Sequence, residues 1–596
     1  MHLSEMYEIP TSRALTDEFR GYNHNLRIGE NEFYDMQNLT STYYPLLSPR
    51  GKRGVYATPV SPQGMISKDA LCYVDGDTFY INGEAVGGLK LSTDAEDCPK
   101  QLVSMGAYVI VLPDKKFINT KDLTEFGDIE ATESTAGVTV TYTLCKQDGT
   151  NYGTPTVSAA EPVNPENMDL WIDTSTTPHS LKQYSSTSSM WVQIATTYIK
   201  ISAPNIARKF KQYDGVKISG IHPALTQLQA LEGQTSVLWD VHRDEANEGA
   251  GDYLVVIGLL DYVSTQDAEH PLTISRTMPI MDYVIESGNR LWGCRYGLNA
   301  DGAVVNEIYA SKLGDFKNWS CYMGVSTDSY TASCGTDGAF TGAIAHNGYP
   351  LFFKETCLHK VYGNFPANFQ IQSIPCRGVQ NGSSKSLAIV NEVLYYKSRN
   401  GVCAYDGSLP SEISTALAEE QYSNAVAGGH DNKYYISMKD KNDVWHLFVY
   451  DASKGFWHKE DNTHVESFCS CRNEMYFIDA ADKKIKTILG SGNKEADPVK
   501  WMAETGVIGT SMPDKKYISS MIIRMAMTIG ARITFFIQYD SCGEWKKLMS
   551  MTGTSLRSFS VPIRPQRCDH FRLRIVGQGE SKIFSITKTI EQGSDL

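Results

Sequence analysis

The chain has 596 residues, about four times the length of an ordinary domain, so two to four domains are expected. Hydrophobic residues make up 41% and charged residues 21% of the sequence, which excludes a disordered, collagen-like or coiled-coil protein. The 55 lysines and arginines are outnumbered by 68 aspartates and glutamates, which gives a net charge of −13. This charge disfavours a protein that reads nucleic-acid sequence through a basic surface.

The first residues contain no positively charged stretch followed by an apolar one, and the strongest apolar run, 253–260, is too short to cross a bilayer. We therefore expect a soluble chain that is not secreted. The 13 cysteines include one close pair, Cys469 and Cys471, with no second pair to complete a tetrahedral zinc site. They are predicted to be reduced thiols, most of them buried.

A strand–turn–strand unit recurs along the chain. Each unit has a turn with Gly or Asn, an aromatic-rich strand, a polar turn and a second strand that often ends near Asp. The 48 glycines and 23 prolines are scattered singly between short Val, Ile, Tyr and Phe clusters, which is typical of many short strands. Seven units begin at Asp69, Gly106, Gly288, Asn347, Asn391, Asn432 and Asn473.

The spacing of these units predicts the fold. The central apolar residues of the later units are Leu291, Leu351, Leu394, Tyr434 and Met475, at spacings of 60, 43, 40 and 41 residues. A period of about 40 to 50 residues is typical of propeller blades, because each four-stranded blade buries its faces only against its neighbours. The chain is predicted to be all-β, with a β-propeller of about six to eight blades.

The unit at 427–457 resembles a kelch blade. It contains the paired glycines Gly428 and Gly429, followed by Trp457. In such a blade the glycines let neighbouring strands pack closely, and the tryptophan fills the gap between blades.

The regular spacing breaks twice. Between about 130 and 275 the composition changes and new strand patterns appear, such as 138–142, which predicts an inserted β-barrel or sandwich. After Asn493, the segments 521–525, 532–539 and 571–575 alternate with period 2, which predicts a C-terminal β-sandwich. The predicted division is an N-terminal segment that packs on or closes the propeller (1–60), first blades (61–130), an inserted platform domain (131–275), remaining blades (276–492) and the sandwich (493–596).

No catalytic motif stands out. The sequence contains no Gly-x-Ser-x-Gly elbow, no phosphate-binding loop ending in Gly-Lys-Ser/Thr and no His-Glu-x-x-His pair. Asp75-Gly76-Asp77 begins like a calcium loop, but Phe79 stands where the next oxygen ligand is needed. We predict a two-residue hairpin turn there instead.

Glycosidase and metal chemistry find little support. Residues 451–457 resemble the Asp-box of sialidase propellers, but Ser453 stands where the defining carboxylate belongs. Glycoside hydrolysis also needs two converging carboxylates, and a pair such as Asp240 and Asp244 is better explained as surface charge. Isolated histidines in strand or turn contexts favour structural roles over metal ligation; they are His359, His446 and His458. No catalytic residue, metal site or cofactor is predicted.

Six tryptophans offer aromatic faces for a sugar-stacking platform, but packing between blades or sheets is the better interpretation. They are Trp292, Trp319, Trp445, Trp457, Trp501 and Trp545.

The chain resembles bacteriophage packaged-DNA stabilisation proteins, which are related to the tail hub or nozzle of short-tailed phages. The resemblance begins at Glu18-Phe-Arg-Gly-Tyr22, 31–40 and 44–50. It continues through 169–173, 288–292, 308–315, 318–319, 538–545 and 567–571, and therefore spans nearly the whole chain.

The resemblance implies a virion structural protein without catalytic residues, so no enzyme is expected. It implies a homohexameric ring below the portal and adaptor proteins, made in the host bacterial cytoplasm, with no membrane anchor. In the virion tail this ring would retain packaged double-stranded DNA, conduct it during ejection and contact tail fibres or other tail proteins. Net negative charge suits such a conduit, because each cation bound to phosphate would add affinity, although the same charge also serves solubility.

Two alternatives remain open. One is a phage tail-tip adhesin that recognises surface glycans through exposed aromatics and the terminal sandwich. The other, which the missing Asp-box carboxylate disfavours, is a propeller glycosidase.

Overall fold

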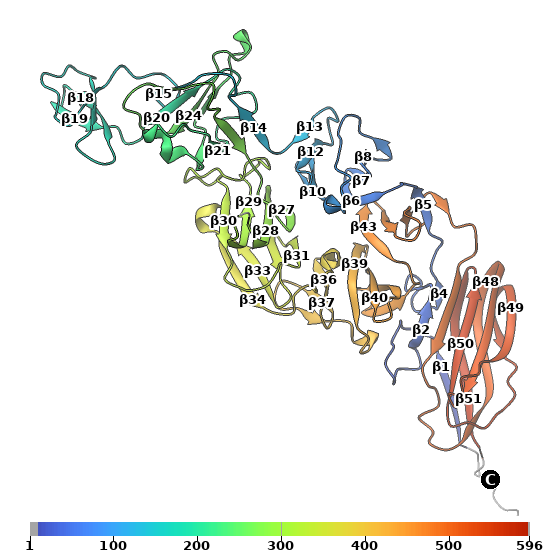
Figure 1. Cartoon of the computed structure of the whole chain (residues 1–596). Coiled ribbons are helices and arrows are strands. Elements are labelled where there is room, and N and C mark those ends of the chain that lie inside the picture. Colours follow the sequence, from blue (N-terminus) through green and yellow to red (C-terminus); the bar gives the residue numbers. More distant parts are fainter. Residues whose placement is uncertain (1–9, 300, 594–596) are drawn as a thin grey trace, which may run out of the picture.

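The computed structural model describes residues 10–299 and 301–593, so the first nine residues of the predicted N-terminal segment lie outside it. Its elements are almost all β-strands, and the longest helix, η2 (Thr226–Leu231), is a 3-10 turn. Within the described ranges, no helix has the length and apolar character needed to span a membrane. Figure 1 shows three bodies in a row, with a propeller between an inserted domain and a terminal sandwich. The predicted all-β architecture is confirmed.

The propeller consists of seven antiparallel sheets, or blades, arranged around one axis. The first three blades are β6 (Pro62–Lys68) to β9 (Glu84–Ala85), β10 (Gln101–Met105) to β13 (Phe126–Asp128), and β27 (Tyr283–Ser287) to β30 (Tyr330–Ser333). The next three are β31 (Gly342–His346) to β34 (Gln370–Pro375), β35 (Ala388–Val390) to β38 (Ser411–Glu412), and β39 (Tyr422–His430) to β42 (Phe456–Lys459). The seventh begins with β43 (Val465–Cys471), which packs against β6 and so closes the circle.

Each recurring unit of the sequence forms part of one blade. The unit at Asn432 supplies β40 (Lys433–Asp440) and β41 (Trp445–Asp451), which pair with Tyr434 opposite Tyr450. The unit at Asp69 supplies β7 (Ala70–Asp75) and β8 (Thr78–Ile81), joined by the two-residue turn that was predicted at Gly76 and Asp77.

A strand from the N-terminal part of the chain completes the seventh blade. Strand β5 (Gly54–Ala57) pairs antiparallel with β45 (Ile485–Thr487), with Gly54 opposite Thr487. A Cβ atom at Gly54 would lie 1.9 Å from the carbonyl oxygen of Ser491, so only glycine fits this approach. The last blade therefore joins two segments that are far apart in the sequence.

The glycine pair and Trp457 have the packing roles predicted from the kelch-like pattern. A Cβ atom at Gly428 would come within 2.3 Å of Met475 in the next blade, and one at Gly429 would come within 2.7 Å of Val390 in the preceding blade. Trp457 is 1% exposed and donates its indole N–H to the Ile413 carbonyl of the preceding blade, at 2.8 Å.

The chain leaves the propeller for the inserted domain, and returns to it, through one pair of strands. Strand β14 (Ala131–Ser134) and strand β26 (Thr273–Arg276) are antiparallel, with Ala131 opposite Arg276. Two sheets cover one apolar core. In strand order, the first consists of β14, β26, β21 (Gly215–Ser219) and β22 (Thr235–Val237), and the second of β23 (Asp240–His242), β24 (Tyr253–Ile257), β20 (Tyr198–Ser202), β15 (Val140–Cys145) and β25 (Ser264–Gln266). A separate distal sheet, β16 (Thr156–Ser158) to β19 (Met190–Gln193), forms the outer tip of this domain.

The terminal sandwich is built around one long, bent strand. Strand β48 (Lys516–Tyr539) pairs with β51 (Ser581–Gln592) in its first half and with β50 (Phe571–Gln578) in its second. Strand β49 (Lys546–Ser560) follows β48 along its length, with its register shifted between Met527 and Arg532. The predicted strands 521–525 and 532–539 are therefore two halves of one strand.

N-terminal strands tie the sandwich to the propeller. Strand β1 (Thr11–Thr16) pairs with β51, and β2 (Phe33–Gln37) pairs with β47 (Lys500–Thr505). Beside them, the backbone N–H of Tyr22 donates to the carbonyl oxygen of Trp457. One apolar core runs from these strands into the fifth and sixth blades.

Candidate functional site

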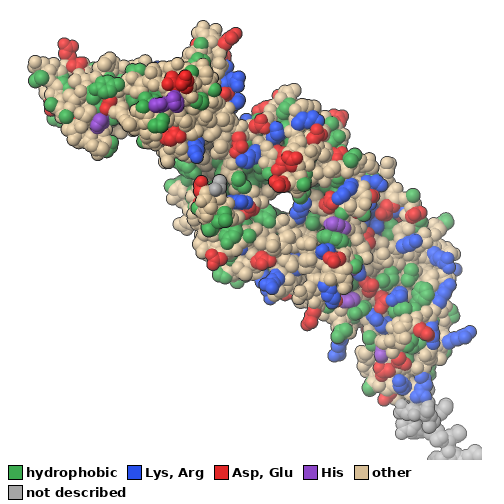
Figure 2. Space-filling model, viewed as in Figure 1, with side chains coloured by type: hydrophobic (Ala, Val, Ile, Leu, Met, Phe, Trp, Pro, Cys, Tyr) green, Lys and Arg blue, Asp and Glu red, His purple; other side chains and the backbone are tan. Residues whose placement is uncertain are grey.

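An axial cavity lies at the centre of the propeller. It has a volume of about 630 Å³ and is lined by residues from five of the blades, and an opening is visible near the middle of Figure 2. Most of the residues come from the segments that lead into or begin the innermost strands, whereas Trp445, Ile478 and Lys483 come from later strands and turns of the sixth and seventh blades. Cavities of this size hold small molecules.

Aromatic and charged side chains give the axial cavity its chemistry. The rings of Trp445 and His464 stack with centroids 3.6 Å apart and an interplanar angle of 10°. Glu466 pairs with Lys483 at 2.5 Å, and its backbone carbonyl accepts from Lys385 at 3.1 Å. Burial lowers the pKa of both His464 and Lys385. Glu466 is the one carboxylate among the lining residues, whereas glycoside hydrolysis normally uses two.

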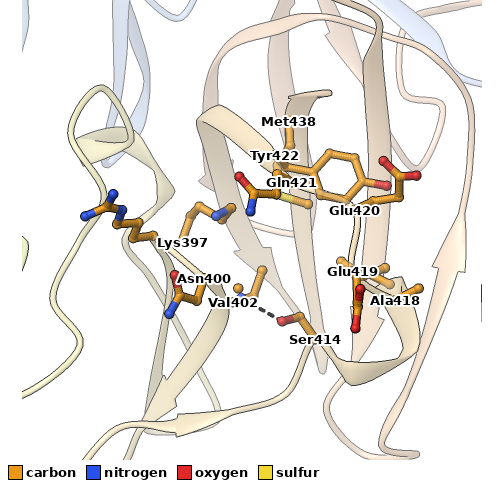
Figure 3. A pocket seen from close by; sticks show the side chains of 13 residues that line it. Lys397, Asn400, Val402, Ser414, Ala418, Glu419, Glu420, Gln421, Tyr422 and Met438 are labelled. Carbon is orange, nitrogen blue, oxygen red and sulfur yellow. Dashed lines mark hydrogen bonds between the residues drawn. The ribbon is translucent and has the colours of Figure 1, made fainter. Parts of the chain in front are cut away.

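A second, interblade pocket of about 300 Å³ lies between the fifth and sixth blades. In Figure 3, Lys397 and Asn400 from the fifth blade face Gln421, Glu420 and Glu419, which precede or begin the sixth. The Lys397 side chain is buried, at 2% exposure. At the bottom of the pocket, the hydroxyl oxygen of Ser414 accepts a hydrogen bond from the backbone N–H of Val402, at 2.9 Å.

The two end domains carry opposite charge. Residues 131–275 contain eight lysines and arginines against 16 acidic residues, whereas residues 493–596 contain 15 against 10. Lysine and arginine side chains are accordingly more frequent over the sandwich than over the inserted domain in Figure 2. The molecule therefore has an acidic end and a basic end on opposite sides of the propeller.

The basic surface lies on β48, β49 and the loop after them. Its exposed members have no carboxylate within 4 Å among the residues that the structure describes; they are Arg524, Arg532, Lys546, Lys547, Arg557 and Arg564. Strand β49 pairs with β48 along one edge, and no described strand covers its other edge. Ile529 and Leu556 add exposed apolar surface, at 102% and 46% exposure.

The acidic surface lies at the distal sheet. Glu161, Glu166 and Asp169 are exposed in the loop before β17 (Leu170–Asp173), and none forms an ion pair within the described ranges. The same tip exposes four apolar side chains: Val163 at 91%, Met168 at 62%, Met190 at 61% and Val192 at 52%. Both ends thus combine unpaired charge with exposed apolar groups.

Four of the six tryptophans pack in the core, as predicted. Trp292, Trp319, Trp457 and Trp501 are at most 3% exposed. The other two are half-buried, although the sequence predicts the same packing role for all six. Trp445 borders the axial cavity, and Trp545 lies under the guanidinium of Arg574, 4.1 Å from its ring centroid.

The histidines have hydrogen-bonding and packing roles. His359 contacts the hydroxyls of Thr336 and Ser373 at 2.9 and 2.8 Å, and His446 contacts Asp440 at 3.0 Å. His458 is buried, which lowers its pKa to about 3.

The acidic residues considered earlier lie in turns and strands. Asp75 accepts from the backbone N–H groups of Val60 and Ser61, and Asp77 pairs with Lys90 at 2.7 Å. Asp244 caps the turn η3 (Glu245–Asn247), whereas Asp240 belongs to β23 (Asp240–His242).

In the described part of the chain, no group of three or more His, Cys, Asp or Glu side chains has the arrangement of a metal site. All 13 cysteines are free thiols, and Cys469 and Cys471 are buried, as predicted.

Comparison with known proteins finds similar solved structures but no matching family. No protein-family profile matches the chain, and no curated protein matches it. Among solved structures, it is similar to an exo-β-1,3-galactanase from Phanerochaete chrysosporium (9% identity, 51% of this chain, 94% of that chain, TM-score 0.20). It is also similar to an engineered family 43 glycoside hydrolase with endo-xylanase and exo-arabinofuranosidase activity (8%, 51%, 96%, 0.19). A third is the Trypanosoma rangeli sialidase in complex with sialic acid (8%, 98%, 95%, 0.24).

These comparisons contradict one prediction. The sequence had led us to expect a chain that is not an enzyme, whereas the solved structures named above are glycoside hydrolases and a sialidase. We therefore withdraw that expectation. At 8 to 9% identity and TM-scores of 0.24 or below, the likeness transfers no substrate or catalytic residue to this chain.

Proposed function

We propose that this chain is a bacteriophage virion structural protein, a tail nozzle or hub that assembles as a ring of copies, retains packaged DNA and conducts it during ejection. The observation that carries the proposal is the pair of oppositely charged ends on either side of the propeller (Figures 1 and 2). A head-to-tail contact between two different surfaces closes into a ring when the rotation between neighbouring copies divides 360° into a whole number of steps.

The two ends complement each other in charge and apolar character. Glu161, Glu166 and Asp169 of one copy would approach Arg524, Arg532 and Arg557 of the next. The exposed side chains of Met190 and Ile529 would be covered in the same contact. Charge complementarity steers such association and sets its orientation, whereas apolar burial supplies most of its free energy.

The same arrangement suits a DNA conduit. Covering the basic sandwich would remove its cations from the lumen, and the remaining segments, 1–130 and 276–492, contain 32 lysines and arginines against 42 acidic residues. A lumen with few free cations holds DNA weakly, since each phosphate contact releases counterions and adds affinity. In this proposal the DNA passes between the copies, because the axial cavity of one propeller is only about 630 Å³.

Mass photometry and negative-stain electron microscopy of the full chain, alone and with the portal and adaptor proteins of its phage, test the proposal. We expect closed rings, six-fold by the family resemblance, which dissociate as salt is raised. An image of the virion labelled at the C terminus should place the chain in the tail. Monomers under every assembly condition, or a label outside the tail, would overturn the proposal.

Charge reversal tests the contact itself. The triple variant Arg524→Glu, Arg532→Glu and Arg557→Glu should remain monomeric, and mixing it with the variant Glu161→Lys, Glu166→Lys and Asp169→Lys should restore association. The control reverses three exposed lysines of the propeller, Lys90, Lys121 and Lys454, and should assemble normally. If both end variants still assemble into rings, this contact is disproved but the nozzle proposal is not.

A further inference from the structure

The interblade pocket contains a buried ammonium group with few partners. Lys397 lies in β36 (Val393–Ser398), and its Nζ donates one hydrogen bond, to the backbone carbonyl of Ser398. In the parts of the chain that the structure describes, no carboxylate forms an ion pair with it within 4 Å. An ammonium group has three donors, and a buried charge is costly when it lacks a counter-charge.

Three other buried lysines, Lys100, Lys354 and Lys588, are better satisfied, whereas Lys516 likewise donates one hydrogen bond, to the carbonyl oxygen of Asp569. Lys100 pairs with Asp114 at 2.7 Å, and Lys588 pairs with Glu30 at 2.7 Å. Lys354 donates to the Asn306 side chain at 3.0 Å and the Thr336 carbonyl at 2.8 Å, and it also faces the ring of Phe340. Lys397 instead lines a cavity with room for the missing partner.

We propose that the interblade pocket binds a small sugar acid, a ring with hydroxyl groups and a single carboxylate, in which the carboxylate pairs with the ammonium of Lys397. The inference does not depend on the proposed role in the tail.

The other lining residues define this ligand class. The apolar lining consists of Val402, Leu417 and Met438, each at most 3% exposed, and the ring of Tyr422, which would contact a sugar ring. The amides of Asn400 and Gln421 supply donors and acceptors that suit hydroxyl groups.

Carboxylates at the pocket limit the charge that it accepts. Glu419 and Glu420 line it on the side opposite Lys397 (Figure 3). They accept hydrogen bonds from hydroxyl groups but repel a second negative charge. The pocket therefore favours a singly charged acid over a phosphate or a polyanion such as DNA.

The backbone at the pocket is strained. Ala418 has φ 58° and ψ −155°, a conformation that is essentially confined to glycine and is found in other proteins at ligand-binding positions. The strained residue lines the cavity beside Leu417 and Glu419, so the segment that leads into the sixth blade is held in the shape of the pocket wall.

The ammonium is charged at neutral pH. Burial lowers the pKa of Lys397 to about 8, so a bound carboxylate is stabilised at pH 7 and loses its partner as the pH rises above 8. The surrounding charged and titratable groups are Arg399, Cys403, Glu412, Glu419, Glu420 and Tyr422. Burial raises the pKa of Cys403 and of Tyr422.

Calorimetric titration of the full chain with glucuronate, galacturonate and N-acetylneuraminate tests the site, with glucose and acetate as probes of each half of the ligand. We expect at least one acid to bind at pH 7 at least tenfold more tightly than glucose or acetate, and more weakly at pH 9. An oligogalacturonate, compared with the monomer, shows whether the pocket takes a free acid or the end of an acidic polysaccharide.

Two variants make the test specific. Lys397→Met should abolish binding of the acid while leaving the melting temperature unchanged or higher, because it removes a poorly compensated buried charge. Lys354→Met, the matched control, should lower the melting temperature and retain binding. The proposal fails if none of the acids binds, if glucose binds as tightly as they do, or if Lys397→Met binds them like the unchanged chain.

Discussion

The guanidinium of Arg53 donates a 2.6 Å hydrogen bond to the carboxylate of Glu460, although 407 positions separate the two residues in the sequence. Both side chains are 6% exposed, and Asp461 lies 2.9 Å from the same guanidinium. Arg53 immediately precedes β5, and Glu460 immediately follows β42. One buried ion pair thus joins the N-terminal segment to the sixth blade beside the point where the propeller closes.

Replacing Arg53 with methionine should lower the free energy of unfolding by up to about 3 to 5 kcal/mol. It leaves the buried carboxylate of Glu460 and the half-buried one of Asp461 with only the longer contacts to Arg50, at 3.9 and 3.8 Å. Urea denaturation measures this loss. Burial alone would raise the pKa of Asp461, but the positive charge of Arg53 holds it below its usual value. The control is Arg20→Met, which removes an exposed pair with Glu18 and should change stability by less than about 1 kcal/mol. Equal effects of the two variants would contradict the prediction.

His359 should make stability depend on pH. Burial lowers its pKa to about 4, whereas an unfolded histidine titrates near 6.5. The unfolded chain therefore binds the proton first, and stability is lost as the pH falls from about 6.5 towards 4, by up to about 3 kcal/mol. Denaturation of the unchanged chain and of His359→Gln at pH 7 and pH 5 should show a shallower loss in the variant. Parallel losses would show that His359 carries no such effect.

Removing Trp457 should weaken the joint between the fifth and sixth blades. We expect Trp457→Ala to cost about 3 to 5 kcal/mol, because a large side chain leaves a cavity in a packed core. The half-buried Trp545 provides the comparison, and Trp545→Ala should cost clearly less in the same thermal or urea denaturation experiment. A reversed order of the two effects would argue against a packing role.

The inserted domain should be removable. Since Ala131 and Arg276 face each other across β14 and β26, a short Gly-Ser linker between residues 130 and 277 needs to span little more than the distance between paired strands. We expect the shortened chain to keep a β-rich circular dichroism spectrum and cooperative unfolding, but to lose ring assembly. Aggregation would instead indicate that docking contacts, such as the Gly215 N–H to Asn318 hydrogen bond at 3.1 Å, are needed for folding.

The repeated part of the fold was readable from the sequence, because each blade repeats the same hairpin with its aromatic positions. Strand β5 was not identified, since four residues, Gly54 to Ala57, carry no periodic pattern and acquire their role only from a partner about 430 positions away. The bend of β48 was missed for a related reason. Gly530 has φ 88° and looks like a turn in the sequence, whereas pairing with β51 before it, with β50 after it and with β49 on both sides keeps the strand continuous.

The candidate sites were less accessible to sequence reasoning than the fold. Lys397 stands in the strand sequence Leu-Tyr-Tyr-Lys-Ser, where the presence of a lysine among buried residues was the only available signal. Trp445 and His464 are 19 positions apart, and their stacking depends on the curvature of the propeller. The two oppositely charged ends could be recognised only from the arrangement of the domains in space, because in the sequence the acidic insertion lies between two blades.

The shared last blade has a consequence for biosynthesis. Its strands β43 to β45 leave the ribosome long after β5, and at roughly 5 to 20 residues per second the interval is on the order of half a minute. During that time the earlier blades are already made, yet the circle cannot close and the flank of β6 is left without its neighbour. Nascent chains should therefore depend on chaperones until the final blade emerges, and a premature stop within it should yield an insoluble product.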